Sequence, residues 1–172
     1  MNIDSPSVIL VAGPLQVRGT SSYTLRLAEL LPDCGYSPVI VSPDLAALPE
    51  EVRPKCPTYE HLLLSSPLFR PLINGLVAQD AVRHNPHLVH IQSRHALPFG
   101  FALAKRLELP CLLTIHDHDK ALTRTMSAGQ PQLKQVIAVS SSVKESLASV
   151  NSLNEDMITV IHSGVTVPEL ID

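Results

Sequence analysis

The sequence predicts an α/β protein with a doubly wound parallel sheet and helices on both faces of the sheet. Short apolar runs recur along the chain, and they are continuous rather than alternating, as in parallel strands that are buried on both faces. Segments with apolar residues at helical spacing lie between these runs. This alternation of strand and helix is typical of crossover connections, and we expect residues 1–172 to form a single domain.

Six apolar runs are the expected strands, at residues 8–12, 38–41, 88–91, 111–115, 136–139 and 158–161. Helical spacing of apolar residues predicts helices at residues 23–31, 99–107 and 143–150. Pro98 suits the first turn of the second helix, and Ser142 with Glu145 forms a capping box for the third. Residues 45–70 are rich in proline and predict a long, partly irregular connection, followed by a helix over residues 67–84.

Composition and charge argue against several classes of function. The net charge is −3 and aromatic residues make up 3% of the chain, without tryptophan, so the basic surface and the stacking side chains of nucleic-acid binding are missing. No apolar run is long enough to span a membrane, and the first residues lack the basic start of a signal peptide, so we expect a cytoplasmic location. The three cysteines are widely spaced and are expected to be reduced thiols.

The strand expected at residues 111–115 runs directly into the polar sequence His116-Asp117-His118-Asp119. Ligands of an open parallel sheet bind beyond the carboxyl ends of its strands, so this junction is the first candidate site. His116 is open to three interpretations: a solvated loop histidine, a metal ligand, or a group that hydrogen-bonds a substrate hydroxyl or phosphate. The H-x-H-x-D-H pattern of binuclear hydrolases is broken at Lys120 and Ala121, so we expect no metal.

A loop that contains Gly19 follows the first expected strand and opens the first expected helix. A glycine at this point lets backbone N–H groups approach a phosphate or sugar oxygen, and the helix dipole favours negative charge there. The other interpretation is an ordinary connection in which Ser21 or Ser22 caps the helix. The sequence has no G-x-G-x-x-G motif, and both interpretations stay open.

Five motifs follow one another along the chain. Residues 18–28 (RGTSSYTLRLA) line up with a Gly-Gly-Ala-Glu helix start, and residues 86–92 (PHLVHIQ) with a P-D-hydrophobic-hydrophobic-H strand. Residues 113–117 (LTIHD) look like a T-hydrophobic-H-D strand end. Residues 136–140 (VIAVS) and 158–165 (ITVIHSGV) look like V-I-A-V-S and I-x-V-I-P-N-G-V. In this order, and over about the whole chain, they resemble the N-terminal half of a retaining glycosyltransferase of family 4, also called group 1, with the GT-B fold.

The resemblance implies a Rossmann-like domain on the acceptor side of a GT-B enzyme, whose C-terminal half, in cis or in trans, binds the nucleotide-sugar donor. It implies transfer of a sugar to a sugar or lipid-linked acceptor with retention of configuration, without a metal or other cofactor, and negligible activity for residues 1–172 alone. His116 carries over as the catalytic histidine near the reacting centre. The substrate-binding residues carried over or inferred from strand ends are Gly19, Arg18, Thr20, Arg94 and Asp117.

This sequence departs from the family pattern at three positions. Arg18 replaces the first glycine of the helix start, and His162 and Ser163 replace the proline and the asparagine of the last motif. These changes leave open an alternative function, a non-catalytic Rossmann-like binding or regulatory module that docks a partner. Arg70 and Arg83, in the helix expected over residues 67–84, give slight support for association with a membrane.

Overall fold

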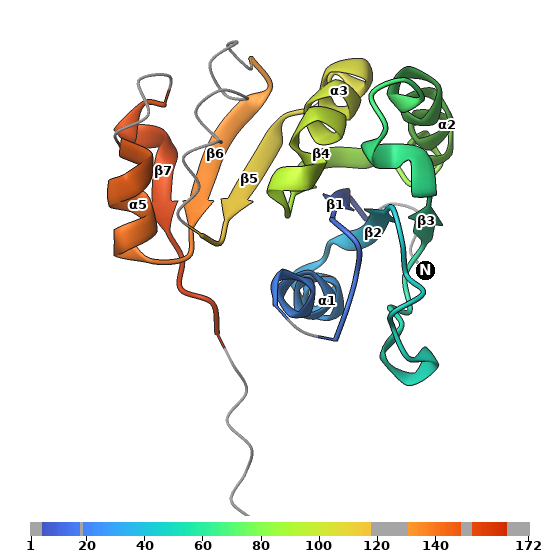
Figure 1. Ribbon diagram of the computed structural model, residues 1–172, viewed down its shortest axis with the longest axis horizontal. Coiled ribbons are helices and arrows are strands. Elements are labelled where there is room, and N and C mark those ends of the chain that lie inside the picture. Colours follow the sequence, from blue (N-terminus) through green and yellow to red (C-terminus); the bar gives the residue numbers. More distant parts are fainter. Residues whose placement is uncertain (1–4, 18, 118–130, 149–152, 165–172) are drawn as a thin grey trace, which may run out of the picture.

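The computed structural model describes residues 5–17, 19–117, 131–148 and 153–164. Its seven strands form one parallel sheet in the order β3-β2-β1-β4-β5-β6-β7 (Figure 1). The chain builds outward from β1 through β2 to β3 and then crosses to the other side of β1, where β4 begins. The fold class predicted from the sequence, a doubly wound Rossmann-like sheet, is confirmed.

The strands are β1 (Ser7–Val11), β2 (Ser37–Ser42), β3 (Thr58–Glu60), β4 (Pro86–Ile91), β5 (Cys111–Ile115), β6 (Leu133–Ala138) and β7 (Ile158–Val160). The α-helices in the described ranges are α1 (Thr20–Leu30), α2 (Arg70–Val82), α3 (Leu97–Leu107) and α5 (Ser141–Ala148). Short 3-10 helices occur at η1 (Leu31–Cys34), η2 (Glu50–Val52), η3 (Leu62–Ser65), η4 (Arg94–Ala96) and η5 (Glu155–Met157).

The sheet separates two apolar cores. The larger core lies beneath α2, α3 and α5, where Val77, Phe99 and Leu147 pack with apolar side chains of the strands. The smaller core lies beneath α1, where Leu25 and Ala28 pack on the opposite face. Figure 1 shows α2 and α3 next to each other on one side of the sheet and α1 on the other. Because helices cover both faces, β1 and β2 are buried along almost their whole length, which is why their apolar sequence runs are continuous.

Three local predictions need correction. The irregular connection over residues 45–70 contains β3, a short edge strand that pairs with residues 40–42 of β2. The helix expected from residue 67 begins at Arg70, with Pro71 in its first turn, where the missing N–H costs no hydrogen bond. Ser140, rather than Ser142, caps α5, because the Ser140 hydroxyl oxygen accepts a 3.2 Å hydrogen bond from the Val143 N–H.

β1 and β4 are neighbours in the sheet, although β2 and β3 come between them in the sequence. The strand order therefore reverses between β1 and β4. At such a reversal the connections that leave the two strands turn to opposite faces, and a crevice opens at the carboxyl ends. The Gln92 N–H donates a 2.8 Å hydrogen bond to the Val11 carbonyl just past these strand ends, which extends the β1–β4 pairing into the loop region. The fold therefore places its ligand crevice at the ends of β1, β4 and β5.

Candidate functional site at the carboxyl ends of β4 and β5

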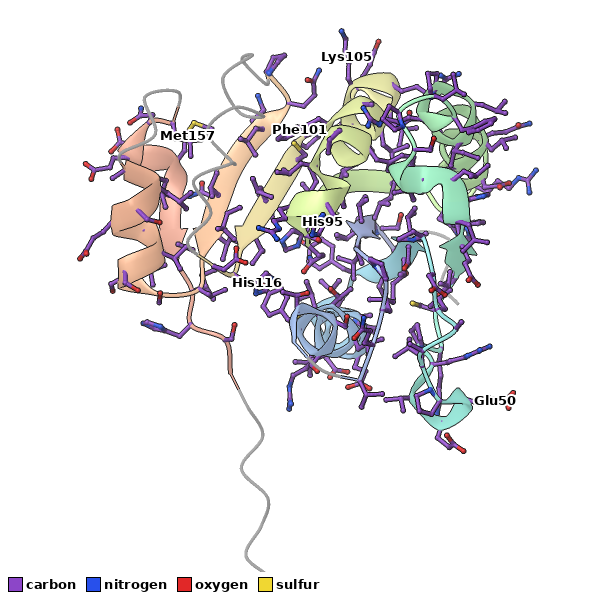
Figure 2. All side chains as sticks on the ribbon, in the orientation of Figure 1. Glu50, His95, Phe101, Lys105, His116 and Met157 are labelled. Carbon is purple, nitrogen blue, oxygen red and sulfur yellow. The ribbon has the colours of Figure 1, made fainter. Side chains whose placement is uncertain are left out.

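A cavity of about 180 Å³ lies at this edge of the sheet. Its walls come from the start of α1, the loop after β4 and the end of β5, three segments that are far apart in the sequence. Figure 2 shows His95 and His116 at this edge, on the side of the sheet that faces α1. The lining residues are Thr20, Ser93, Arg94, His95, Thr114, Ile115, His116 and Asp117.

The cavity gathers most of the residues predicted from the sequence. Thr20, Arg94, His116 and Asp117 all line it. Gly19 directly precedes Thr20, and Arg18 lies outside the described residues. The structure therefore brings four of the six predicted site residues to one place, while the role of each residue stays a prediction.

Gly19 occupies the N-cap position of α1 with φ 68° and ψ −141°. A side chain would strain this backbone conformation, so the position requires glycine for its φ alone. The helix starts here without a side-chain cap and without a carboxylate in its first turn, so the positive end of its dipole is not neutralised by its own residues. Neither Ser21 nor Ser22 caps the helix, which favours the anion-binding interpretation of this loop over the capping one.

His116 is held in a defined orientation. The ring of Tyr23 on α1 contacts it edge-on, with 5.1 Å between the ring centroids and 75° between the ring planes. A hydrogen bond links the imidazole to the backbone of Gln92. Because the Gln92 N–H is already bonded to Val11, the Gln92 carbonyl is the acceptor and a ring nitrogen of His116 is the donor.

The remaining ring nitrogen of His116, Nε2, is buried and has no hydrogen-bond partner in the described part of the chain. Burial lowers the pKa of His116, and this effect outweighs the nearby charge of Asp117 and the Gln92 hydrogen bond, which both raise it. The ring is therefore neutral near pH 7, with Nδ1 carrying the proton and Nε2 carrying a lone pair. Such a nitrogen accepts a hydrogen bond from a hydroxyl group of a ligand.

A second polar layer lies beneath His116. His90 on β4 is buried, and its Nε2 lies 2.8 Å from the Thr114 hydroxyl on β5. Burial, together with the proximity of His116, lowers the pKa of His90 to about 4, so this ring is also neutral near pH 7. The two side chains hydrogen-bond each other across β4 and β5, directly beneath the site.

The sequence analysis did not select Ser93, His95 or Thr114 of the cavity lining, nor Gln92, which lies directly before Ser93. The Gln92 side chain is 1% exposed, and neither its amide oxygen nor its amide nitrogen has a hydrogen-bond partner among the described residues. Leaving a buried amide unpaired costs stability, so its presence next to His116 calls for an explanation. In the sequence, only the position of Gln92 directly after a strand marked it as a residue of this edge.

The described residues contain no group of three histidine, cysteine or carboxylate side chains that could hold a metal ion. His118, Asp119, Lys120 and Ala121, on which the metal interpretation depended, lie outside these residues. None of the described helices has the length and apolar character that crossing a membrane requires.

Comparison with known proteins decides the family. The sequence model of Glycosyltransferase Family 4 matches residues 17–167, which is most of the chain. The chain belongs to glycosyltransferase family 4. No curated protein sequence matches it. The resemblance inferred from the five motifs is thereby confirmed.

Solved structures agree with this family at the level of the fold. A glycosyltransferase from Rickettsia africae is 23% identical over 94% of this chain and 44% of its own length, with a TM-score of 0.76. The Anabaena protein HepE, solved with UDP and glucose, is 15% identical over 95% of this chain and 47% of its own length, with a TM-score of 0.70. The lipopolysaccharide outer core galactosyltransferase WaaB is 11% identical over 95% of this chain and 47% of its own length, with a TM-score of 0.72.

This chain spans less than half the length of those structures. Its fold is that of the N-terminal, Rossmann-like domain of a GT-B glycosyltransferase.

Proposed function

We propose that this chain is the acceptor-side domain of a retaining glycosyltransferase that moves a sugar from a nucleotide-sugar donor to a sugar or lipid-linked acceptor. The observation that supports this function best is the unpaired, lone-pair-bearing Nε2 of His116, fixed at the ligand edge of a family 4 fold. A sugar presents hydroxyl groups, and these are the donors that such a nitrogen accepts. The edge thus has the chemistry that sugar binding needs.

In this proposal His116 orients the transferred sugar near its reacting carbon. Gly19 and Thr20 present backbone groups at the positive end of α1 to the leaving diphosphate or to the acceptor, because that helix end stabilises negative charge. Arg94 and Asp117 contact the acceptor from the loops after β4 and β5. Arg18 acts beside Gly19 and contributes positive charge toward phosphate.

The donor-binding half is a C-terminal partner domain, supplied in cis or in trans. The proposed reaction uses no metal or other cofactor, since charged side chains and backbone amides neutralise the leaving group. Residues 1–172 alone are then expected to show negligible transfer. Addition of a C-terminal half is expected to restore it.

The test is a transfer assay with radiolabelled UDP-glucose and other UDP-sugars, run on residues 1–172 with and without an added C-terminal half. Proton NMR of the product gives the anomeric configuration, which is expected to match that of the donor. Full turnover by residues 1–172 alone would refute the proposal that a separate C-terminal half binds the donor. An inverted product would refute the retaining mechanism while leaving the family unchanged.

The alternative is a non-catalytic binding module of the same fold. The observation that favours it is an exposed apolar surface on η3 and α2, away from the cavity. His116→Ala in the assembled enzyme separates the two functions. Loss of turnover with intact folding favours catalysis, and unchanged turnover favours the module.

A further inference from the structure

The unpaired amide of Gln92 has a position that bears on the specificity of the site. The residue is 1% exposed, and its amide oxygen and nitrogen both lack a hydrogen-bond partner in the described part of the chain. A buried polar group of this kind has lost its bonds to water and gained none in return, which is rare in folded proteins. At the ligand edge of a parallel sheet, such an amide is a candidate for binding a ligand directly.

Gln92 points to the same face of the sheet as His116. Side chains alternate between the two faces along extended backbone, and the pairing of β4 with β1 continues to Gln92. Ile91 of β4 and Ile115 of β5 both pack in the larger core. The residues that follow them, Gln92 and His116, therefore point to the opposite face, which α1 covers. The contact between His116 and Tyr23 of α1 agrees with this direction.

The register of β4 and β5 makes the two side chains neighbours. His90 is paired with Leu112, and its Nε2 lies 2.8 Å from the hydroxyl of Thr114, two residues further along β5. The same register, extended by two residues, sets Gln92 opposite Thr114 and places His116 two residues further. The amide and the imidazole are thus related as His90 and Thr114 are. Thr114 and His116 both line the cavity, so the amide lies next to it.

Three unpaired groups meet at this point. The Gln92 amide supplies an acceptor oxygen and an NH₂ donor, whichever way the amide is turned, and Nε2 of His116 supplies a second acceptor. One hydroxyl group pairs two of them, because its hydrogen is donated to the imidazole while its oxygen accepts from the NH₂ group. A neighbouring hydroxyl group donates to the amide oxygen. Two adjacent hydroxyl groups of a sugar ring therefore match all three groups.

We propose that Gln92 is a specificity-determining residue whose side-chain amide, together with His116, binds two neighbouring hydroxyl groups of the transferred sugar. The inference rests on the proposed transferase function and adds a second protein group to its sugar site. It accounts for an amide that is unpaired in the free domain, since its partner arrives with the substrate. The three groups are also closed to solvent, so the cavity lining shifts when the sugar binds.

The free domain distinguishes this role from that of a trapped water molecule. A water between the amide and the imidazole would pair the same groups before any sugar binds. Gln92→Met would then remove hydrogen bonds and lower the melting temperature. An amide that is paired only by the substrate gives the opposite result, because methionine removes an unpaired polar group from the free domain.

The test is a transfer assay with the enzyme assembled with its C-terminal half, run with UDP-glucose and its four monodeoxy analogues. For the wild type and Gln92→Met, the quantity compared is the fall in kcat/KM caused by each missing hydroxyl group. A hydroxyl that is bound elsewhere costs both proteins the same factor. A hydroxyl that bonds the Gln92 amide is expected to cost the wild type about tenfold to a hundredfold more than it costs Gln92→Met.

Gln135→Met is the matched control. It also replaces a glutamine on a strand, but the Gln135 amide bonds Thr159 on β7, and the residue lies outside the cavity lining. This variant is expected to reject each analogue by the same factor as the wild type does. A general loss of packing at a glutamine would lower kcat/KM for every sugar alike and leave these factors unchanged.

Two results would overturn the proposal. The first is a set of factors that are the same in the wild type and Gln92→Met for every analogue. The second is a lower melting temperature of Gln92→Met, which would assign the amide to a trapped water. An enzyme that transfers no sugar would refute the proposed function alone, because calorimetric dissociation constants of the same five compounds give the same comparison without turnover. Failure of both proteins to bind any of the five would refute both proposals.

Discussion

Replacing Gln92 with methionine should make the protein more stable. The Gln92 side chain is buried, and neither of its polar atoms has a partner among the described residues. An unsatisfied buried polar group costs about 1–3 kcal/mol, and methionine has nearly the same unbranched shape without those groups. Allowing for imperfect packing, the free energy of unfolding should rise by about 2 kcal/mol, which raises Tm by roughly 4–8 °C in a domain of this size.

Urea unfolding followed by circular dichroism measures this change, and Gln135→Met provides the matched control. The Gln135 amide donates a 2.7 Å hydrogen bond to the Thr159 hydroxyl, so its loss should destabilise the fold by about 1 kcal/mol. A drop in stability for Gln92→Met would refute the reasoning, since it would show that the amide has partners in solution, such as an ordered water. In the assembled enzyme, greater stability together with lower turnover would mark Gln92 as a residue kept for function at a cost in stability.

Two further predictions concern the buried histidine layer and the packing of α3. The pKa of His90, at about 4, lies below that of the unfolded chain, so the unfolded chain binds one more proton between pH 6.5 and 4. The free energy of unfolding should then fall by up to about 1.4 kcal/mol per pH unit on acidification. In urea titrations at several pH values, His90→Leu/Thr114→Val should flatten this slope. An unchanged slope in the variant would contradict the assignment of the slope to His90. Gly100→Ala places a methyl group 2.6 Å from Cγ1 of the buried Ile91 and should cost about 1–3 kcal/mol. In Gly75→Ala the added methyl group has its nearest contact at 3.4 Å, so the free energy of unfolding should rise by about 0.5–1 kcal/mol. Thermal melts should therefore shift in opposite directions for the two variants. Shifts in the same direction would contradict this description of the packing.

The sequence was sufficient to predict elements with strong local signals. Residues 111–115 form β5 with the predicted bounds, because an apolar run between polar residues has few alternatives in a buried parallel sheet. His116 and Asp117 were predictable as site residues for the same reason, since they follow such a strand. Arg94 and Thr20 reach the same cavity because the carboxyl ends of parallel strands meet at one edge.

Other features depend on contacts that the sequence does not show. β3 consists of three residues in a proline-rich segment and exists through its pairing with β2. The importance of Gln92 comes from its burial and from the hydrogen bond between its backbone and His116, neither of which has a local signature. The exposed leucines of η3 and α2 were also missed, because leucines at helical spacing predict burial until the structure shows which side of the helix is covered.

The central claim is that His116 acts at a sugar-transfer site. The most direct test is the rate of sugar transfer by the enzyme assembled with its C-terminal half, measured for the wild type, for His116→Ala and for His87→Ala. His87 is an exposed histidine at the start of β4, at the other end of the strand. We predict that His116→Ala lowers kcat about a hundredfold or more while the variant stays folded by circular dichroism, and that His87→Ala turns over as the wild type does. Equal rates for the wild type and His116→Ala would contradict the claim.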